Sequence, residues 1–469
     1  MRKLSAIDAS FLYTETEHMP NSIAALQILE LPDGMDADQF LEYLSQHYMD
    51  RIHLLPYLYS KVRTTPGNFD HPVWVTDKNF DISNHIRVET VPPPGDMSCL
   101  EARVAELHAE LLDRGRPLWL LVIFKGLENP RQIAYYSAAH HACLDGMAGT
   151  AATEILMDDT PDPAPVESPE VFPPQDDDSS AELWRMSIQN LMRTQLSIPL
   201  AMFSMAESLE HLAERILDPR KFMGAYGRTA PRTRFNHAIE KERSYAVCDF
   251  SLDDIKSMKA AAGCTLNDVI LAICAGGLRS YLQRHDDLPE KPLIAAVPVS
   301  LRAPDSHEMN NQVTMMSVSL ATDIDDPWTR LCGIRDSELT GKEVMADIVT
   351  GFDNDFAMPG LPAVVIQSAR LFDRLHLAEA APVAMNVVIS NVPGPRHCLY
   401  SAGAKLLANY PVSIPAHGLG VNITVGSYVD TFYLGITACA RALPDAGELR
   451  DDILEAFRAL RELLHEKQN

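Results

Sequence analysis

A proline-rich acidic run between Pro161 and Asp178 (PDPAPVESPEVFPPQDDD) divides this chain of 469 residues into two long parts. Proline fixes φ and removes a backbone donor, so this run cannot form a regular helix or a central strand. The whole chain is also longer than one hydrophobic core usually supports. We therefore predict an N-terminal domain over 1–160, a linker with a helical connection over 161–240, and a C-terminal domain over 241–469.

Both predicted domains mix helix and strand patterns, which indicates an α/β fold class. In the first domain, short apolar runs predict strands and a periodic segment predicts a helix; in the second, two helical patterns are long. These segments are Ala24–Leu29 and Leu118–Phe124 (strands), and Ser98–Leu112, Leu266–Leu282 and Ala446–His465 (helices).

The connection is expected to contain two helices over Ser179–Leu217, broken at Pro199. Their apolar stripe includes Trp184, Ile188, Met202 and Phe203. Such a stripe suits either core packing or contact with lipid.

Composition restricts the class of function. The chain has 64 acidic and 40 basic residues, giving a formal charge of -24, which repels nucleic acid. Its eight cysteines are scattered without a CxxC pair, which favours a reducing, cytoplasmic location. No run of about eighteen apolar residues occurs, so we expect neither a signal peptide nor a membrane span, and any membrane contact is expected to be peripheral.

The residues with the clearest chemical implication are paired histidines at the end of an apolar run, IAYYSAAHHACLDGMAG. Successive strand side chains point to opposite faces, so only one of His140 and His141 can readily enter a given cavity. This geometry argues against a shared metal, and we expect no metal site. From residue types alone, the pair could also be two core histidines. Asp145 is expected to fix the following loop through an arginine, and Gly146 to allow a close turn.

His140-His141-Ala142-Cys143-Leu144-Asp145-Gly146 resembles the HHxxxDG motif of the coenzyme A-dependent acyltransferase superfamily, which includes chloramphenicol acetyltransferase-like enzymes and peptide-synthetase condensation domains. This resemblance implies that His141 is the catalytic base and that His140 is structural. It also implies that Asp145 forms a conformational salt bridge, for which Arg51 and Arg302 are the candidates.

Further motifs resemble one family within that superfamily, the wax ester synthase/diacylglycerol acyltransferases. They are Leu4-Ser5-Ala6-Ile7-Asp8 with Phe11-Leu12, Phe80-Asp81 to His85, Arg116-Pro117-Leu118-Trp119, Leu266-Asn267-Asp268-Val269, Val297 to Arg302, Asn311-Gln312, Ser390-Asn391-Val392-Pro393-Gly394-Pro395 and Tyr410 to Ser413. The candidate substrate-binding residues among them are Pro117, Leu118, Trp119, Asn267, Asp268, Ser390, Asn391, Pro393 and Gly394. Each has an alternative scaffold role, and helix capping favours a structural role for Asn267.

The chain departs from the family pattern at Met19-Pro20-Asn21-Ser22, where a Pro-Met-His sequence is usual. A role for that histidine in lining an entrance is therefore in doubt in this protein.

The resemblance implies a two-domain chloramphenicol acetyltransferase-like fold with a tunnel at the domain interface. It implies acyl-CoA as co-substrate, no cofactor, and diacylglycerol or a long-chain fatty alcohol as acceptor. We expect a monomer or homodimer in the cytoplasm, peripherally associated with membrane or lipid droplets. In the implied mechanism, His141 removes the hydroxyl proton as the oxygen attacks the thioester, and no covalent intermediate forms.

Four alternatives are open at this stage. The protein could use a carrier-protein thioester, or be an inert lipid-binding protein of the same fold. It could be a His-His-Asp metal hydrolase, although no matching ligand spacing such as H-E-x-x-H occurs. Finally, Cys143 could act as a nucleophile, although no G-x-S-x-G elbow is present.

Overall fold

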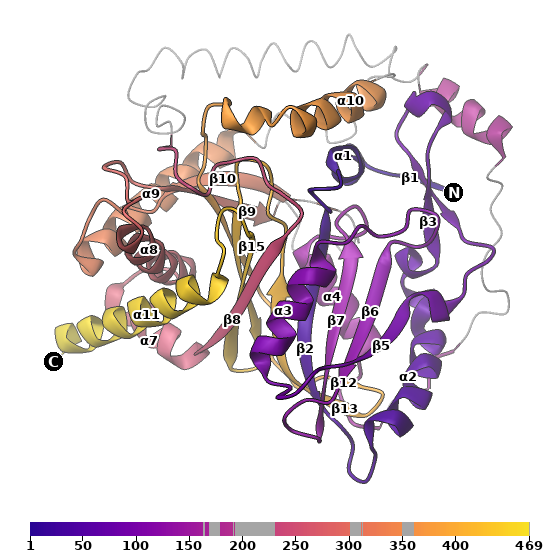
Figure 1. Cartoon of the computed structure of the whole chain (residues 1–469), viewed down its shortest axis with the longest axis horizontal. Coiled ribbons are helices and arrows are strands. Elements are labelled where there is room, and N and C mark those ends of the chain that lie inside the picture. The colour runs from indigo at the N-terminus through magenta and orange to yellow at the C-terminus, as the bar shows by residue number, and fades with distance from the viewer. Residues whose placement is uncertain are drawn as a thin grey trace.

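The computed structural model describes residues 1–162, 165–167, 179–190, 192, 230–300, 311, 313–348 and 361–468. Two six-stranded sheets form its framework (Figure 1). The first has the order β12-β13-β2-β7-β6-β5 and the second β10-β9-β11-β14-β15-β8. Most buried apolar side chains of the first sheet belong to one cluster and most of those of the second sheet to another, while Tyr245, Val247, Tyr428 and Tyr433 of the second sheet pack into the first cluster. The two-domain α/β architecture expected from the sequence is confirmed.

The strands of the first sheet are β2 (Ser22–Glu30), β5 (Ile86–Thr90), β6 (Trp119–Lys125), β7 (Gln132–His140), β12 (Tyr400–Ser401) and β13 (Ala404–Val412). Those of the second are β8 (Arg243–Ser251), β9 (Ile294–Ser300), β10 (Val313–Ser319), β11 (Val387–Val392), β14 (Val421–Tyr428) and β15 (Thr431–Cys439). A small third sheet contains β1 (Arg2–Lys3), β3 (Ser60–Arg63) and β4 (Val73–Thr76).

The N-terminal part contributes helices α1 (Ala6–Thr14), α2 (Ala37–Arg51), α3 (Met97–His108) and α4 (Gly146–Leu156). The C-terminal part contributes α7 (Leu252–Ala262), α8 (Leu266–Arg284), α9 (Pro327–Ile348), α10 (Leu361–Arg374) and α11 (Ala446–Gln468). Short 3₁₀ turns occur at Ile52–Leu54, Pro56–Leu58, Pro66–Asn68, Ile82–Asn84 and Leu377–Glu379.

The helices and strands predicted from periodicity are present, although α3 ends at His108 and not at the predicted Leu112. Helix α8 begins at Leu266 as expected, because Thr265 and Asp268 form a reciprocal capping box there. In the connection, residues 180–190 form a helix, whereas the rest of the predicted helix pair, including Pro199, Met202 and Phe203, lies outside the described residues.

The division into domains does not follow sequence order at one point. Strand β13, from the C-terminal half, pairs antiparallel with β2 and so extends the first sheet. It also packs against β15, where a side chain at Gly435 would approach the Pro411 carbonyl oxygen to 1.9 Å. The expected C-terminal domain, 241–469, therefore requires a correction at Tyr400–Val412, because the free edge of β2 takes its hydrogen-bonding partner from that segment.

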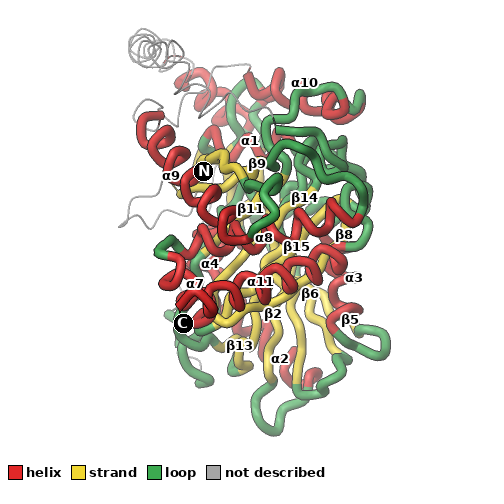
Figure 2. Tube along the Cα trace, turned by 90° about the vertical axis from the view of Figure 1, so that its left-hand side faces the viewer, coloured by secondary structure: helices red, strands yellow, loops and turns green. Residues whose placement is uncertain are grey.

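Helix α3 lies between the two sheets (Figure 1). Its Glu101 carboxylate accepts a hydrogen bond of 2.8 Å from the Val247 amide of β8. In the second domain, α11 packs against α7, α8 and β8 (Figure 2). Among the described helices, none is by itself long and apolar enough to cross a membrane, although α7 and α8, bent by 100°, would together pass by length and composition.

Candidate active site

The two histidines leave the central strand β7 and enter different surroundings. His140 is fully buried, and its Nε2 lies 2.9 Å from Glu15 Oε2. The half-buried His141 ring stacks on Phe11 of α1, with ring centroids 4.0 Å apart and an interplanar angle of 10°. The different surroundings of the two imidazole rings agree with the alternation of side chains between the two faces of a strand. His141 is therefore the histidine placed against α1.

The backbone of His141 is held on both sides. Its N–H donates to the Asn21 carbonyl at 2.7 Å, and its own carbonyl accepts from Asn311 Nδ2 at 2.7 Å. Asn311 is in turn fixed by Asp8 of α1, whose Oδ1 accepts from both its backbone N and its Nδ2. The His141 position thus depends on the N-terminal segment 8–21 and on Asn311, both far from it in sequence.

Burial lowers the pKa of His141 to about 4, against the opposing effects of its own backbone, Asp145 and Asn311. The imidazole is consequently neutral near pH 7, with a ring nitrogen available to accept a proton. Neutrality is what a general base requires in its resting state.

Asp145 and Gly146 form the start of α4. Asp145 is the N-cap residue, and its Oδ1 accepts from the Ala148 amide at 2.8 Å. Of the two arginines considered as partners for Asp145, Arg51 forms an ion pair of 2.7 Å with Asp158, and Arg302 lies outside the described residues. The described contacts give Asp145 a capping role.

Gly146 permits the start of α4 to lie close to the Ser390–Pro395 segment. A Cβ atom there would lie 2.9 Å from Val392 Cγ2, in the Ser390–Pro395 segment. Gly394 has a similar role, because its Cβ would lie 2.0 Å from the Ser427 carbonyl oxygen while its N–H donates to Ser427 Oγ at 3.0 Å. Half-buried Ser390 and Asn391 occupy the end of β11, and Val392 separates them from Pro393. The structure thus brings this segment against the first turn of α4.

The Pro117-Leu118-Trp119 segment lies mainly in the core. Leu118 is fully buried, and the Trp119 indole donates to the Leu58 carbonyl at 2.8 Å and stacks on His85. The described contacts of Leu118 and Trp119 are those of packing residues.

Asn267 and Asp268 hold α8 rather than approach the histidines. Asn267 Nδ2 donates to Glu338 of α9 at 3.1 Å, and Asp268 completes the capping box with Thr265. These contacts are structural, as the sequence favoured for Asn267.

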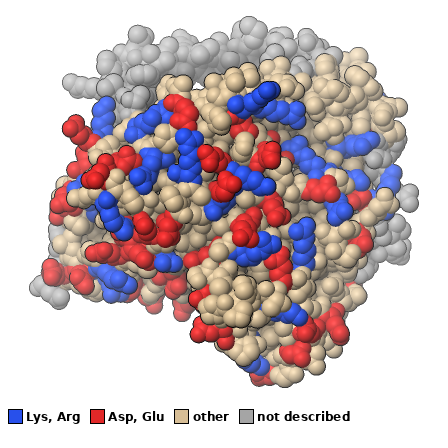
Figure 3. Space-filling model, viewed as in Figure 1, with Lys and Arg blue, Asp and Glu red and all other residues tan. Residues whose placement is uncertain are grey.

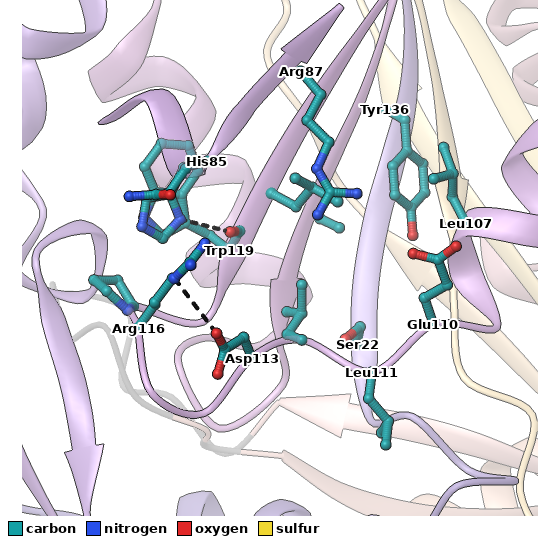
Figure 4. A pocket seen from close by; sticks show the side chains of 15 residues that line it. Ser22, His85, Arg87, Leu107, Glu110, Leu111, Asp113, Arg116, Trp119 and Tyr136 are labelled. Carbon is teal, nitrogen blue, oxygen red and sulfur yellow. Dashed lines mark hydrogen bonds and ion pairs between the residues drawn. The ribbon is translucent and has the colours of Figure 1, made fainter. Parts of the chain in front are cut away.

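A cavity of about 100 Å³ borders Pro117 and Trp119 (Figure 4). Ser22 also lines it and is paired directly with His140 across β2 and β7, so the cavity opens on the His140 face of the sheet. Arg87 and Glu110 point into it (Figure 4). This polar cavity lies beside the buried histidine.

The alternative chemistries have little support in this geometry. Burial raises the pKa of the Cys143 thiol far above its usual value, which disfavours the nucleophilic thiolate. Within the described residues, no group of three or more His, Cys, Asp or Glu side chains could hold a metal ion.

Comparison with known proteins places this arrangement in a family. The family model for the wax ester synthase/diacylglycerol acyltransferase catalytic domain matches residues 4–270, and that for the family's C-terminal domain matches residues 309–461. The chain belongs to the wax ester synthase/diacylglycerol acyltransferase family. The resemblance seen in its motifs is thereby confirmed over most of its length.

Individual members of the family are similar to this chain over nearly its whole length. A Mycobacterium tuberculosis protein named for diacylglycerol O-acyltransferase activity is 34% identical, over 94% of this chain and 95% of its own. The O-acyltransferase WSD of Acinetobacter baylyi is 32% identical, over 95% of this chain and 93% of its own.

Solved structures show the same fold. The wax ester synthase/diacylglycerol acyltransferase of Marinobacter aquaeolei VT8 is 28% identical, with a TM-score of 0.68 and coverage of 99% and 100% of the two chains. A trichothecene 15-O-acetyltransferase of Fusarium sporotrichioides, at 13% identity and covering 98% and 94%, has a TM-score of 0.59. The starter condensation domain of rhizomide synthetase, at 13% identity and covering 99% and 94%, has a TM-score of 0.57. These two distant relatives share the fold expected from HHxxxDG.

Several residues around His141 were not identified as site residues from the sequence. Asp8, Phe11 and Asn311 occur in the quoted family motifs, but nothing local reveals that they meet at His141. Glu15 and Asn21 lie outside those motifs. Only the folded chain shows their contacts.

Proposed function

We propose that this protein transfers a long-chain acyl group from acyl-CoA to the hydroxyl of diacylglycerol or a long-chain fatty alcohol. The observation that carries the proposal is the neutral, half-buried His141 ring, fixed by Phe11, Asn21 and Asn311. Support comes from relatives named as diacylglycerol O-acyltransferases or wax ester synthases. The related condensation domain was solved in complex with C8-CoA, which supports an acyl-CoA donor.

In the proposed reaction, His141 accepts the hydroxyl proton while the alcohol oxygen forms a bond to the thioester carbonyl carbon. The resulting tetrahedral oxyanion collapses, the C–S bond breaks, and the proton passes from His141 to the departing thiolate. General base action contributes roughly a hundred- to ten-thousand-fold. Asn391 or a backbone amide of Ser390–Pro395 is proposed to stabilise the oxyanion, because this segment packs against the turn that follows His141.

The acyl chain is proposed to follow the His141 face of the first sheet toward the domain interface. Ser137 and Ala139 precede His141 at alternate positions of β7 and therefore share one face. Ser137 is exposed even though β7 is paired on both sides, and Ala139 is only half-buried. Room beside these small side chains supports a tunnel there.

We also propose a cytoplasmic location with peripheral contact to membrane or lipid droplets, because the proposed acceptors are insoluble in water. Two stripes of exposed apolar side chains on helices support this contact. On α10 and just beyond, Val364, Leu371 and Leu375 are each more than half exposed. Arg370 and Arg374 are exposed beside them. An apolar stripe flanked by basic residues suits an anionic lipid surface.

The second stripe lies on the helix over 180–190 and its continuation, where Trp184, Ile188 and Met192 are exposed. This is the described part of the segment expected to touch lipid. Acidic and basic side chains are interspersed over the face in Figure 3, and the net charge is -24. Attraction to lipid must therefore be local rather than general.

The catalytic proposal is tested by incubating purified protein with labelled palmitoyl-CoA and a panel of diacylglycerols and fatty alcohols, with His141→Ala in parallel. Ester formation by the wild type and its loss in a folded His141→Ala protein are expected. Ester formed equally by both proteins would exclude His141 as the base. Hydrolysis of palmitoyl-CoA to palmitate and free coenzyme A, without formation of ester, would exclude the proposed transfer.

The lipid proposal is tested by liposome flotation of a Val364→Ser, Leu371→Ser, Leu375→Ser protein and of a Trp184→Ser, Ile188→Ser protein. Tyr43→Ser with Leu54→Ser provides the matched control, since both side chains are exposed apolar groups at α2 and the following turn. Reduced flotation of the stripe variants alone is expected. Met202→Ser with Phe203→Ser tests the remainder of the predicted helix pair. Unchanged flotation of all these variants would contradict the proposed contact.

A further inference from the structure

Glu15 connects α1 to the turn that carries His141. It is the C-cap residue of α1, the helix whose Phe11 stacks on His141. Its carboxylate is 7% exposed and lies between two cationic or proton-bearing partners. One oxygen, Oε1, accepts from Arg114 Nε at 2.8 Å; the other, Oε2, lies 2.9 Å from His140 Nε2.

The opposite nitrogen of His140 determines where its proton must be. His140 Nδ1 accepts a hydrogen bond of 3.0 Å from the Ala142 amide, so Nδ1 carries no proton in this arrangement. A neutral ring then carries its proton on Nε2, the nitrogen that lies 2.9 Å from Glu15 Oε2 in a close polar contact that falls short of hydrogen-bond geometry. An ionised carboxylate can only accept, so it favours this tautomer.

The same turn is closed by the His140 backbone, whose carbonyl accepts from the Cys143 amide at 2.8 Å. His141 therefore lies inside a turn bonded through both the ring and the backbone of His140. Arg114 also donates to the Leu12 carbonyl at 2.7 Å, so one guanidinium holds Glu15 and the end of α1 together.

The electrostatics agree with an ionised Glu15. Burial acts to raise the pKa of its carboxyl, but the close contact with His140 and the adjacent guanidinium of Arg114 outweigh that effect and lower it. Removal of the charge would leave buried polar groups without their partners.

We infer that Glu15 is a positioning residue of the acyl transfer: it holds His140 in the tautomer protonated at Nε2 and thereby sets the orientation of His141. This inference rests on the proposed function. Glu15 contacts His140 rather than His141, so it acts through the turn and not on the substrate.

The isosteric variant Glu15→Gln separates charge and tautomer from size. Its single carbonyl oxygen can face either Arg114 or His140, and the amide group must face the other. If the NH₂ group of the variant side chain faces Arg114, two hydrogen-bond donors face each other. If the NH₂ group faces His140 Nε2, that nitrogen must accept, so the proton moves to Nδ1 and the hydrogen bond from the Ala142 amide is lost. Glu15→Asp keeps two acceptor oxygens on a shorter chain and is the conservative variant.

Glu101→Gln is the matched control. Glu101 is 8% exposed, accepts a backbone hydrogen bond from Val247, and lies 3.6 Å from Arg450, without contact to the histidine turn. The Glu101→Gln variant removes the charge of another buried, arginine-paired carboxylate at the domain interface, away from His140.

Steady-state transfer from palmitoyl-CoA is measured for these proteins, with thermal unfolding midpoints and nitrogen-15 NMR of the His140 ring. A misplaced catalytic group typically costs about 100-fold, so we expect Glu15→Gln to reduce kcat by roughly 10- to 100-fold with KM for palmitoyl-CoA within about two-fold. Glu15→Asp should recover part of kcat, and Glu101→Gln should retain it. His140 should be protonated at Nε2 in the wild type.

A kcat for Glu15→Gln within two-fold of wild type would overturn the inference, as would equal losses in Glu15→Gln and Glu101→Gln. If Glu15→Gln does not fold, the wild-type NMR decides, because a proton on Nδ1 of His140 contradicts the assignment without any variant. Failure of the proposed function is distinguishable: the wild type would then form no ester, or His141→Ala would form it normally.

Discussion

The stacked contact between Phe11 and His141 predicts how acyl transfer depends on pH. Burial depresses the pKa of His141 to about 4, and Phe11 covers one face of the ring at 4.0 Å. Phe11→Ala should admit water to that face and stabilise the imidazolium. The pKa should therefore rise toward its usual value of about 6.5.

The magnitude follows from the titration. The full shift from about 6.5 to about 4 corresponds to about 3 kcal/mol between the two protonation states. With a pKa of about 4, about 97% of His141 is neutral at about pH 5.5; with a pKa of about 6, about 24% is. The neutral form is the active base, so activity is present above the folded-state pKa and is lost as the pH falls through it.

The assay is kcat/KM for the alcohol between about pH 4.5 and pH 8, since this ratio reports the free enzyme. Relative to pH 7.5, the wild type should retain nearly all of kcat/KM at about pH 5.5, and Phe11→Ala only about a quarter. Phe80→Ala is the matched control, because Phe80 stacks on His85 in the same way, with ring centroids 5.4 Å apart. Its acid limb should coincide with that of the wild type.

A fall of wild-type activity with a midpoint near pH 6.5 would contradict this prediction, because the His141 ring would then be well solvated. Equal shifts of the acid limb in Phe11→Ala and Phe80→Ala would contradict it as well. Unfolding midpoints at each pH distinguish a titration of the base from acid unfolding.

Further changes test the other parts of the site. His141→Ala should lower kcat by roughly a hundred- to ten-thousand-fold in a folded protein, measured as ester from labelled palmitoyl-CoA. Asp145→Asn should cost little stability if capping is its main role, since asparagine is an equally good cap, whereas loss of a buried arginine pair would cost about 3 to 5 kcal/mol in denaturant unfolding. Gly146→Ala should destabilise the fold by about 1 to 3 kcal/mol through its contact with Val392, and Val392→Ala should restore much of that loss in a double-mutant cycle. Intact-mass spectrometry during turnover should detect no stable acyl-enzyme; an adduct abolished by Cys143→Ser would establish a covalent route.

The local pattern of the sequence determined a substantial part of this protein. Strand periodicity placed His140 and His141 at the end of a central strand, and the two side chains do enter different surroundings. Capping residues determined where α8 begins. These features depend on neighbours within a few residues, whose chemistry can be read directly from the sequence.

Only the tertiary structure decided which distant residues surround His141. Phe11 and Asn311 are 130 and 170 residues away from it in sequence, and they meet it because α1 and the segment before β10 pack on the same turn. Glu15 and the transfer of β13 to the first sheet were likewise not predictable from local pattern. The physical reason is common to all of them: free strand edges, buried amides and buried charges require partners, but local sequence does not specify which distant segment supplies them.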